Sequence, residues 1–397
     1  MEFHMHQRIM TKQKFLNKVR IPIRRSFQFT IVYLFFASIF FSSCTKQTPV
    51  KPPTPANPAN PSTPTSPTNS TASISIRGAD LSFLPEIESA GIRYKNNGEI
   101  QDPLLTLKNA GCNYIRLRIW HSPSGTNSSL SEVKKMAERI RLLGMKVWLC
   151  VHYSDSWADP GKQSKPDAWK SINFSELKSA AEVYTANVVN EIKPDLIQIG
   201  NETNDGFLWP DGKLTTNETQ FIQLMQTTIS AVRKNAAGTK IMIHFAGLTG
   251  SDWFFNKLNN LDYDYVGLSY YPIHHGTLLE KLGQTIKALT ASSNKKVLVA
   301  EVAYPFTLSW NDWTNNIVGL PSHLVSGYDA SPDGQKSFLE GLRKMIGDNG
   351  GIGFCYWGGE WVAFKGPQAS NGSPWENQAL WDFGYNALPA INAFKEN

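Results

Sequence analysis

Two glutamates lie at or near the ends of apolar, strand-like runs in distant parts of the sequence. Glu202 ends the run DLIQIGNE, and Glu301 lies within KKVLVAEVAYP. A buried strand that stops on a carboxylate points it at whatever lies beyond the sheet, and two such strands in one barrel place both carboxylates over one mouth. Two facing carboxylates, one protonated and one ionised, are the minimum equipment for breaking a glycosidic bond.

Eight short β-rich runs could supply that barrel, with amphipathic segments of helical periodicity between them. The clearest helical segment is 130–144, and residues 174–192, 218–235 and 333–350 behave alike. This alternation predicts an α/β fold that is a single (β/α)8 TIM barrel. A doubly wound sheet is the main alternative, but it would need a Gly-rich turn after its first strand, and GxGxxG is absent. The runs are 75–84, 113–120, 146–153, 195–202, 240–247, 265–272, 296–305 and 351–359.

The strand ends carry polar and aromatic residues where a barrel keeps its active site. Side chains alternate along a strand, so Arg116 and Arg118 share one face and we expect them to point into the barrel. Buried arginines need acidic partners, and the two glutamates are candidates. Asn201 could hydrogen-bond the 2-hydroxyl of a sugar. Other candidate substrate-binding residues at the strand ends are His152, Asp155, Trp157, His244, Tyr271, Trp357 and Trp361.

Tryptophan is abundant, with 12 residues, several of them in loops that follow strands. Flat indole faces complement the C–H faces of pyranose rings, whereas other tryptophans would only cap the core. We expect at least two of the loop tryptophans to be exposed in a groove. They are Trp157, Trp209, Trp310, Trp313 and Trp361.

Metal catalysis is a competing interpretation because His152 and His244 also end strands. Barrel metallohydrolases usually begin with His-x-His on the first strand, whereas residues 77–80 here read Arg-Gly-Ala-Asp. We therefore expect no cofactor to be required for catalysis. The two histidines would orient carboxylates or donate to substrate hydroxyls.

The N-terminal part of the chain reads as an export signal and a tether. Residues 1–43 combine a basic start, the apolar run 29–41 and two serines before Cys44, which resembles a bacterial lipoprotein cleavage site. Residues 44–73 are rich in Pro, Ser and Thr and predict a flexible linker. Residues 74–397 form the catalytic domain. We expect an exported protein, lipid-anchored at Cys44 to the membrane of the bacterial envelope and monomeric; plain secretion is the alternative.

The net charge of +6 belongs to the leader rather than to the domain. Residues 1–28 hold seven basic side chains and one acidic side chain, which leaves 32 of each sign in the remainder. A neutral domain gives no basis for nucleic-acid binding. Cys112, Cys150 and Cys355 lie in apolar runs without paired spacing, so we expect buried free thiols rather than disulfides.

Several motifs resemble glycoside hydrolase family 53, the endo-β-1,4-galactanases. They are GNETNDGFLWP at 200–210, VHYSDSWADPGKQSKPDAW at 151–169, NYIRLRIWHSP at 113–123, KIMIHFAG at 240–247 and AEVAYP at 300–305. The resemblance runs from about Gly78 to Phe394. It implies Glu202 as acid/base and Glu301 as nucleophile, with net retention.

The resemblance also implies roles for the residues around the two glutamates. Arg116, Asn201, His244 and Tyr271 would contact the reacting groups, with Tyr271 hydrogen-bonded to the nucleophile. Trp157, Trp209 and Trp361 would be sugar platforms, and Trp357 would floor the −1 subsite. The sequence departs from the family pattern at 358–361, which read Gly-Gly-Glu-Trp where a Glu directly after the first Trp is common.

Bacterial members of the family often hold a structural calcium in the loop after the seventh strand. Here Asp312, Thr314 and Asn316 keep alternate oxygen ligands, which suits calcium, although a tryptophan stands where the first ligand is expected. The resemblance therefore implies a possible structural Ca²⁺ at these three residues.

Together these features predict an endo-acting enzyme that cuts β-1,4-galactan, including the type I arabinogalactan side chains of pectin. One alternative is a related barrel acting on mannan, xylan or glucan. Another is a surface glycan-binding lipoprotein without catalysis. The presence of both glutamates, Arg116 and Asn201 argues against a vestigial site.

Overall fold

The computed structural model describes residues 74–396. The predicted signal peptide, linker and Cys44 lie outside these residues. Within the described range, every helix is too short or too polar to cross a bilayer.

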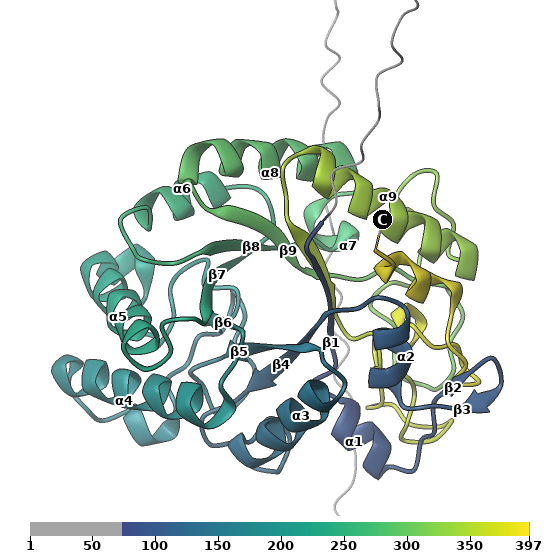
Figure 1. Cartoon of the computed structure of the whole chain (residues 1–397), viewed down its shortest axis with the longest axis horizontal. Helices are drawn as coiled ribbons and strands as arrows, with labels where there is room; N and C mark the ends of the chain where they lie inside the picture. The colour runs from purple at the N-terminus through teal and green to yellow at the C-terminus, as the bar shows by residue number, and fades with distance from the viewer. Residues whose placement is uncertain (1–73, 397) are drawn as a thin grey trace, which may run out of the picture. The chain divides into compact units, whose positions relative to one another are not determined.

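Eight parallel strands close into a barrel, which confirms the predicted (β/α)8 fold (Figure 1). Each expected run overlaps one strand, and the first strand pairs with both the second and the last, so the sheet has no open edge. The strands are β1 (Ile76–Asp80), β4 (Tyr114–Ile119), β5 (Lys146–Val151), β6 (Leu196–Ile199), β7 (Lys240–Ala246), β8 (Tyr265–Ser269), β9 (Lys296–Val302) and β10 (Gly353–Tyr356).

Helices surround the barrel, and a two-stranded hairpin, β2 (Lys95–Asn96) and β3 (Glu99–Ile100), projects from the loop after α1. The four helices expected from periodicity are α3 (Leu130–Leu142), α4 (Phe174–Ile192), α5 (Leu214–Asn235) and α9 (Pro332–Asp348). The others are α1 (Leu84–Ser89), α2 (Pro103–Asn109), α6 (Ser251–Lys257), α7 (Pro272–His275) and α8 (Leu279–Ser293), with 3-10 turns η1 (Asp167–Trp169), η2 (Pro321–His323), η3 (Glu376–Gln378) and η4 (Pro389–Phe394).

Helix α3 shows why these segments fold as they do. Its buried residues Val133, Met136, Ala137 and Ile140 recur at helical spacing and face the barrel. The side chain of Ser129 caps its first turn by accepting from the backbone N–H of Glu132. Burying one apolar stripe of each helix against the sheet builds the outer core layer.

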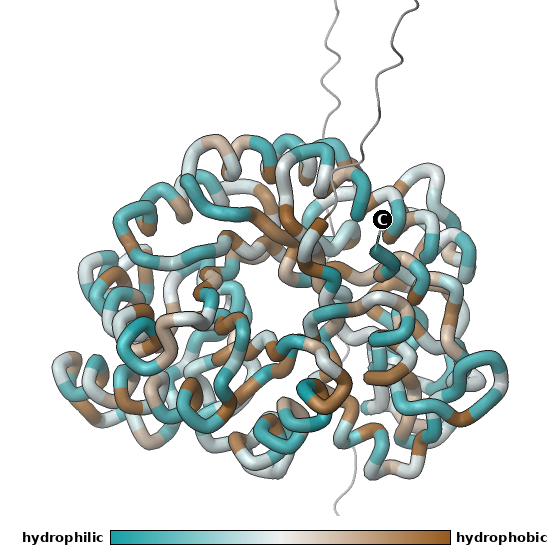
Figure 2. The backbone as a smooth tube through the Cα atoms, viewed as in Figure 1, coloured by the Kyte–Doolittle hydropathy of each residue, from teal (hydrophilic) through white to brown (hydrophobic). Residues whose placement is uncertain are grey.

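The core has two layers because side chains alternate along each strand. Ile115, Leu117 and Ile119 of β4 pack outward against the helices. A smaller cluster, which includes Trp148, fills the barrel interior, and the guanidinium of Arg116 lies 5.9 Å from the Trp148 ring. Figure 2 shows hydrophobic residues concentrated on the strands, whereas the outer helices alternate between hydrophobic and hydrophilic residues.

Cys112, Cys150 and Cys355 are buried free thiols, as predicted. Burial raises the pKa of Cys112 and of Cys150 to about 12, so both remain protonated and act as small apolar side chains.

Candidate active site

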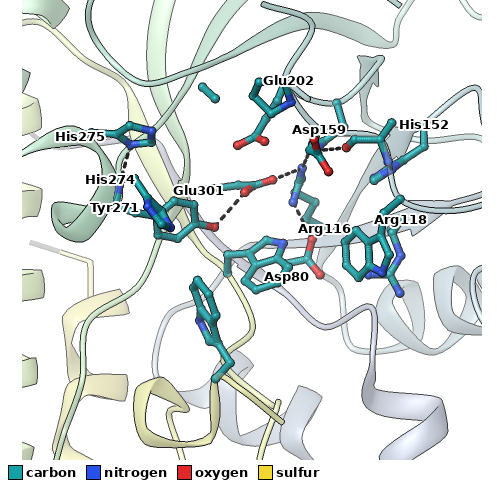
Figure 3. A pocket seen from close by; sticks show the side chains of 17 residues that line it. Asp80, Arg116, Arg118, His152, Asp159, Glu202, Tyr271, His274, His275 and Glu301 are labelled. Carbon is teal, nitrogen blue, oxygen red and sulfur yellow. Dashed lines mark hydrogen bonds and ion pairs between the residues drawn. The ribbon is translucent and has the colours of Figure 1, made fainter. Parts of the chain in front are cut away.

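A cavity of about 360 Å³ opens at the carboxyl ends of the barrel strands (Figure 3). Both predicted catalytic glutamates line it, and the lining as a whole comes from all eight strands or from the loops that follow them. The lining includes Asp80, Arg116, Arg118, His152, Trp157, Asp159, Asn201, Glu202, Ala246, Tyr271, His274, His275, Glu301, Trp357 and Trp375.

Glu301 faces the cavity because β9 is irregular. Leu268 of β8 pairs with Val299, but the next residue, Ser269, pairs with Glu301, so one residue of β9 is extra. Ala300 therefore packs inside the barrel and Glu301 also points inward, although adjacent residues of a regular strand face opposite sides. The glutamate lies within the strand, one residue before its end.

Arg116 connects Glu301 to the floor of the cavity. One nitrogen of its guanidinium lies 2.7 Å from the carboxylate of Glu301, and another lies 2.8 Å from that of Asp80. The remaining N–H groups donate to the side-chain oxygens of Gln198 at 3.1 Å and Asn201 at 2.9 Å. The prediction that Arg116 pairs with a catalytic glutamate is therefore confirmed for Glu301, and the second acidic partner is Asp80 rather than Glu202.

Glu202 lies three residues beyond the end of β6, and not on the strand itself as the sequence predicted. Its φ is 48°, in the left-handed region that side chains other than glycine adopt infrequently. The buried side chain of Gln163 donates to the backbone oxygens of Asn201 and Glu202, at 2.7 and 3.2 Å. This clamp from the loop after β5 stabilises the unusual turn and aims Glu202 into the cavity.

A short relay of hydrogen bonds orients the Glu202 side chain. The hydroxyl of Ser269 donates to its carboxylate at 2.6 Å, and the same hydroxyl lies 2.9 Å from Nε2 of His244. Nδ1 of His244 accepts from the amide of Gln198 at 2.9 Å, so the ring proton lies on Nε2 and donates to Ser269. Because no cation within residues 74–396 pairs with Glu202, its surroundings differ sharply from those of Glu301.

The two carboxyl groups are close enough to share chemistry, with one oxygen of Glu202 within 4.8 Å of one oxygen of Glu301. Burial, and then the charge of Glu301, raise the pKa of Glu202 to about 8. Burial also raises the pKa of Glu301, but Arg116 and the hydroxyl of Tyr271, which donates at 2.8 Å, oppose that rise. The carboxyl group of Glu202 therefore holds its proton near neutral pH, whereas Arg116 and Tyr271 favour the ionised form of Glu301.

Aromatic rings form the wall of the cavity next to Glu301. Trp357 lines this wall. Its ring centroid lies 4.8 Å from that of Trp375, 6.2 Å from that of Trp157 and 6.5 Å from that of Tyr271, and its contacts with Trp375 and Tyr271 are edge to face. Such a wall offers apolar faces to a sugar ring while the carboxylates act beside it.

Arg118 lies among three of the neighbouring rings. Its guanidinium carbon is 4.0 Å from the Trp157 ring, 4.6 Å from Trp120 and 4.7 Å from Phe83. Its Nε donates to the hydroxyl of Ser128 at 2.9 Å, and burial lowers its pKa to about 10, so it stays charged. As predicted, both arginines of β4 point inward, but aromatic rings rather than a carboxylate hold Arg118.

Several predicted substrate-binding residues line the cavity, namely Arg116, His152, Trp157, Asn201, Tyr271 and Trp357. His152 accepts the backbone N–H of Ala158 on Nδ1 at 3.0 Å, and burial lowers its pKa well below the ordinary value. It is therefore a neutral imidazole whose Nε2–H is free to donate.

Asp155 and Trp209 do not line this cavity, so their contact with substrate stays a prediction. Asp155 instead fixes loops, because its two oxygens accept the backbone N–H groups of Ser122 and Asp167 at 2.9 and 2.7 Å. The indole of Trp209 donates to the backbone oxygen of Asp205 at 2.8 Å. Both residues shape the loops around the site.

His244 and Trp361 also lie behind the cavity rather than in it. His244 is fully buried and acts on Glu202 through Ser269. Trp361 stacks on Phe83, with ring centroids 3.9 Å apart and planes 17° apart, and meets Trp357 only by its edge. Each contacts residues around the cavity, and direct contact with sugar stays a prediction for both.

The site also contains residues that the sequence did not single out. Ser269 is a polar last residue of β8, and His275 follows it on α7, so strand ends gave a signal for both. Gln198 shares the inward parity of β6 with the core residue Leu196. Trp375 comes from the long loop after β10, where no periodicity marks it.

Glu202, His244 and Glu301 could hold a metal by proximity alone, since their ligand atoms lie within 4.8 Å of one another. Their bonding does not fit that role. Both ring nitrogens of His244 are already in hydrogen bonds, and Glu301 already pairs with the cation of Arg116. The donor set is therefore arranged for carboxylic acid chemistry.

The loop after β9 gathers oxygen atoms that lack partners. Among the described residues, Oδ2 of Asp312, Oδ1 of Asn316 and Oε2 of Glu376 are buried without a hydrogen bond. The hydroxyl of Thr314, the third predicted ligand, donates to the backbone of Ala369 and accepts from Gly372, which leaves one lone pair on its oxygen. Glu376, on η3, is the acidic residue of this cluster that the sequence did not reveal.

Comparison with known proteins agrees with the site. The sequence model of glycosyl hydrolase family 53 matches residues 76–394. The chain is 35% identical to an arabinogalactan endo-β-1,4-galactanase of Cellvibrio japonicus, over 80% of this chain and 90% of that protein. It is 31% identical to an endo-β-1,4-galactanase of Bacillus subtilis, over 81% and 85% of the two chains.

A solved structure agrees as well. The catalytic domain of a family 53 enzyme from Ignisphaera aggregans superposes with a TM-score of 0.76 at 38% identity, covering 83% of this chain and 97% of that one. The chain is therefore a glycoside hydrolase and belongs to glycosyl hydrolase family 53.

Proposed function

We propose that the enzyme hydrolyses β-1,4-galactosidic bonds inside galactan chains, including those that branch from pectin, with retention of anomeric configuration. The galactanases among its relatives support the substrate. One oxygen of Glu202 lies within 4.8 Å of one oxygen of Glu301, and this close approach supports the stereochemistry. Retaining glycosidases hold this pair about 5–5.5 Å apart, whereas inverting enzymes need about 6.5–9.5 Å to admit a water.

In the first step Glu202 donates its proton to the oxygen of the bond that breaks, while Glu301 attacks the anomeric carbon. The C–O bond to the leaving sugar breaks as the bond to Glu301 forms, and the sugar departs with the proton. In the second step Glu202, now ionised, takes a proton from water. That water displaces Glu301 and restores both carboxyl groups.

The neighbours of Glu301 maintain the charge that the nucleophile needs. Arg116 and Tyr271 each donate to one of its oxygens, at 2.7 and 2.8 Å. The side chain of Asn201 accepts from Arg116 and gives one N–H to the backbone of Ala158, which leaves its other N–H for the 2-hydroxyl of the sugar.

The test is release of reducing ends from linear β-1,4-galactan, β-1,3-linked arabinogalactan, mannan, xylan and carboxymethylcellulose, with a chain that starts near Ile74. We expect oligosaccharides from the β-1,4-galactan alone, and NMR of the first product should show the β-anomer. Hydrolysis of another polymer would overturn the proposal that β-1,4-galactan is the substrate. Galactan binding without hydrolysis would favour a glycan-binding lipoprotein.

We propose that the loop after β9 binds a structural Ca²⁺ through Asp312, Asn316 and Glu376. The fit rests on two carboxylates and an amide whose buried oxygens lack other partners. When bound, the ion would offset the charges of Asp312 and Glu376 and fasten the loop to η3. Stoichiometric calcium in a dialysed sample, and a lower Tm after chelation that Asp312→Ala reproduces, would support the site; a dialysed sample without calcium would discard it.

We propose that the chain is exported and lipid-anchored to the cell envelope through Cys44, and that it acts as a monomer on its polysaccharide. The sequence around Cys44 carries this proposal. Labelled palmitate should enter the wild-type chain and not Cys44→Ser, and release of the variant into the medium would agree. Light scattering of the soluble domain tests the monomer.

A further inference from the structure

A second hollow lies next to the catalytic cavity. It has a volume of about 490 Å³ and lies between the loop after β7, with the start of α6, and the side of α8 that carries Lys281, Gln284 and Thr285. His275 lines both hollows. We call the second one the α6–α8 groove, and its polar lining residues are Thr249, Ser251, Asp252, Lys281, Gln284 and Thr285.

Local contacts connect the turn at Glu202 to His275, the residue that both hollows share. Two residues after Glu202, the amide of Asn204 exchanges hydrogen bonds of 2.7 and 2.8 Å with the backbone of Ala246 at the end of β7. The next residue, Gly247, has a φ of 90°, and a Cβ at its position would lie 3.1 Å from the His275 ring. The turn that carries Glu202 therefore leads through the end of β7 to His275.

The position of the acid sets the direction of a bound chain. The sugar that departs must lie on the side of the proton donor, since its oxygen receives the proton. Ser269 of β8 holds the Glu202 side chain toward β7 and β8. The two tryptophans of the aromatic wall come from other loops, Trp357 from the loop after β10 and Trp157 from the loop after β5. In Figure 3, His275 lies on one side of Glu202 and Glu301, and His152 and Arg118 lie on the other.

We propose that the α6–α8 groove binds the departing, reducing-end part of a neutral polysaccharide chain, and that His275 hydrogen-bonds the first sugar that enters it. The sugar whose bond breaks then lies against the aromatic wall. This inference rests on the proposed function and adds the direction and the extent of the substrate.

The chemistry of His275 suits an uncharged, hydroxyl-rich ligand. Nδ1 of His275 accepts the backbone N–H of Tyr271 at 3.0 Å, so the ring proton lies on Nε2. Burial, and then the neighbouring His274, lower the pKa of His275 to about 4, so the ring stays a neutral donor near neutral pH.

The lining of the groove differs from that of the catalytic cavity. It carries hydroxyl and amide groups with one lysine and one aspartate, and no aromatic platform. Hydrogen bonds would therefore hold the departing chain without stacking. That is a weaker hold, which suits a product that must leave.

The double variant Lys281→Ala/Gln284→Ala tests the groove, with Lys287→Ala on the same helix but outside the lining as its matched control. Two substrates are compared: β-1,4-galactan, which fills both sides, and a nitrophenyl β-1,4-galactotrioside, whose departing group is a small phenol. We expect kcat/KM on galactan to fall roughly tenfold, several times more than on the nitrophenyl substrate. The control should behave as wild type on both.

Cleavage of galactohexaose labelled at its reducing end tests the direction. Loss of groove contacts should move the preferred cut toward the labelled end, because fewer sugars are then held beyond the cut. If the preferred cut moves toward the unlabelled end, the groove binds the other part of the chain and the proposed direction is reversed. If kcat/KM falls equally on galactan and on the nitrophenyl substrate, the groove does not bind the departing chain. Wild-type protein that leaves galactan intact would instead overturn the proposed function.

Discussion

Glu301 and Glu202 are the same residue type in two unlike settings. Glu301 lies in a strand and is bound by the cation of Arg116 and the hydroxyl of Tyr271. Glu202 lies on a left-handed turn and receives one hydroxyl, from Ser269. The comparison shows how a barrel separates two roles: donors stabilise the charge of one carboxylate, while burial beside that charge keeps the other protonated.

Replacing each glutamate by glutamine should have the largest effect on activity and should separate the two roles most clearly. Glu301→Gln removes the proposed nucleophile and should lower kcat by about 10⁴-fold or more on any substrate. Glu202→Gln removes the proposed proton donor and should cost about 10²–10⁴-fold on galactan. The measurement is steady-state kinetics on galactan and on a nitrophenyl β-1,4-galactotrioside.

The second substrate separates the roles, because nitrophenolate leaves without a proton. Glu202→Gln should still release nitrophenol in a burst, and added azide should accelerate turnover, whereas Glu301→Gln should show neither. Rescue of Glu301→Gln by azide with a β-configured product would exchange the two assignments.

Arg116→Gln should produce the next largest effect. It leaves the buried carboxylates of Glu301 and Asp80 without their cation, so the pKa of Glu301 rises and the nucleophile becomes protonated. We expect kcat to fall about 10²–10³-fold and the free energy of unfolding to fall by about 3–5 kcal/mol. Kinetics and urea denaturation measure the two effects.

The control for Arg116 is Arg139→Gln, which removes a partly exposed arginine that pairs with Glu88 at 2.8 Å and with Asp102 at 3.1 Å. Solvent screens these pairs, so their loss should cost below about 1 kcal/mol and leave activity intact. Equal losses in the two variants would mean that Arg116 contributes only as an ordinary ion pair.

The sequence predicted much of this arrangement because strands and helices impose regular spacing. Alternation along β4 placed Arg116 and Arg118 inside the barrel, and the eight runs fixed which loops share a mouth. Two features escaped that logic. The extra residue in β9 turns Glu301 inward, and the clamp from Gln163 stabilises the turn at Glu202, and both depend on contacts between distant segments.

Residues on long loops were beyond prediction for a related reason. Trp375 and Glu376 follow β10 by many residues, and no period links them to the cavity or to Asp312. Trp361 was expected to bind sugar because indoles suit sugars, but residue type alone cannot say that Phe83 stacks on it. Composition reveals the chemistry available, whereas tertiary packing decides which side chain reaches the cavity.

The pH dependence of the wild-type enzyme should reflect the pKa of Glu202. The acid must be protonated to donate, so activity is present below its pKa and lost as the pH rises through about 8. We expect kcat/KM to fall about tenfold per pH unit above that value. A profile that falls already near pH 5 would mean that Glu202 ionises normally and that burial does not hold its proton.

Ser269→Ala should have the smallest effect of these variants, and it tests how the pKa of Glu202 is set. The Ser269 hydroxyl donates to the Glu202 carboxylate and so favours its ionised form. Without it the pKa of Glu202 rises, and the alkaline limb of kcat/KM should move to higher pH by up to about one unit, while kcat falls about two- to tenfold. The matched control is Ser293→Ala, which removes a buried hydroxyl bonded to Leu289 on α8 and should leave the profile in place. A shift of the alkaline limb to lower pH would show that Ser269 stabilises the protonated form of Glu202 instead. In that case both this hydroxyl and burial beside Glu301 would keep Glu202 protonated.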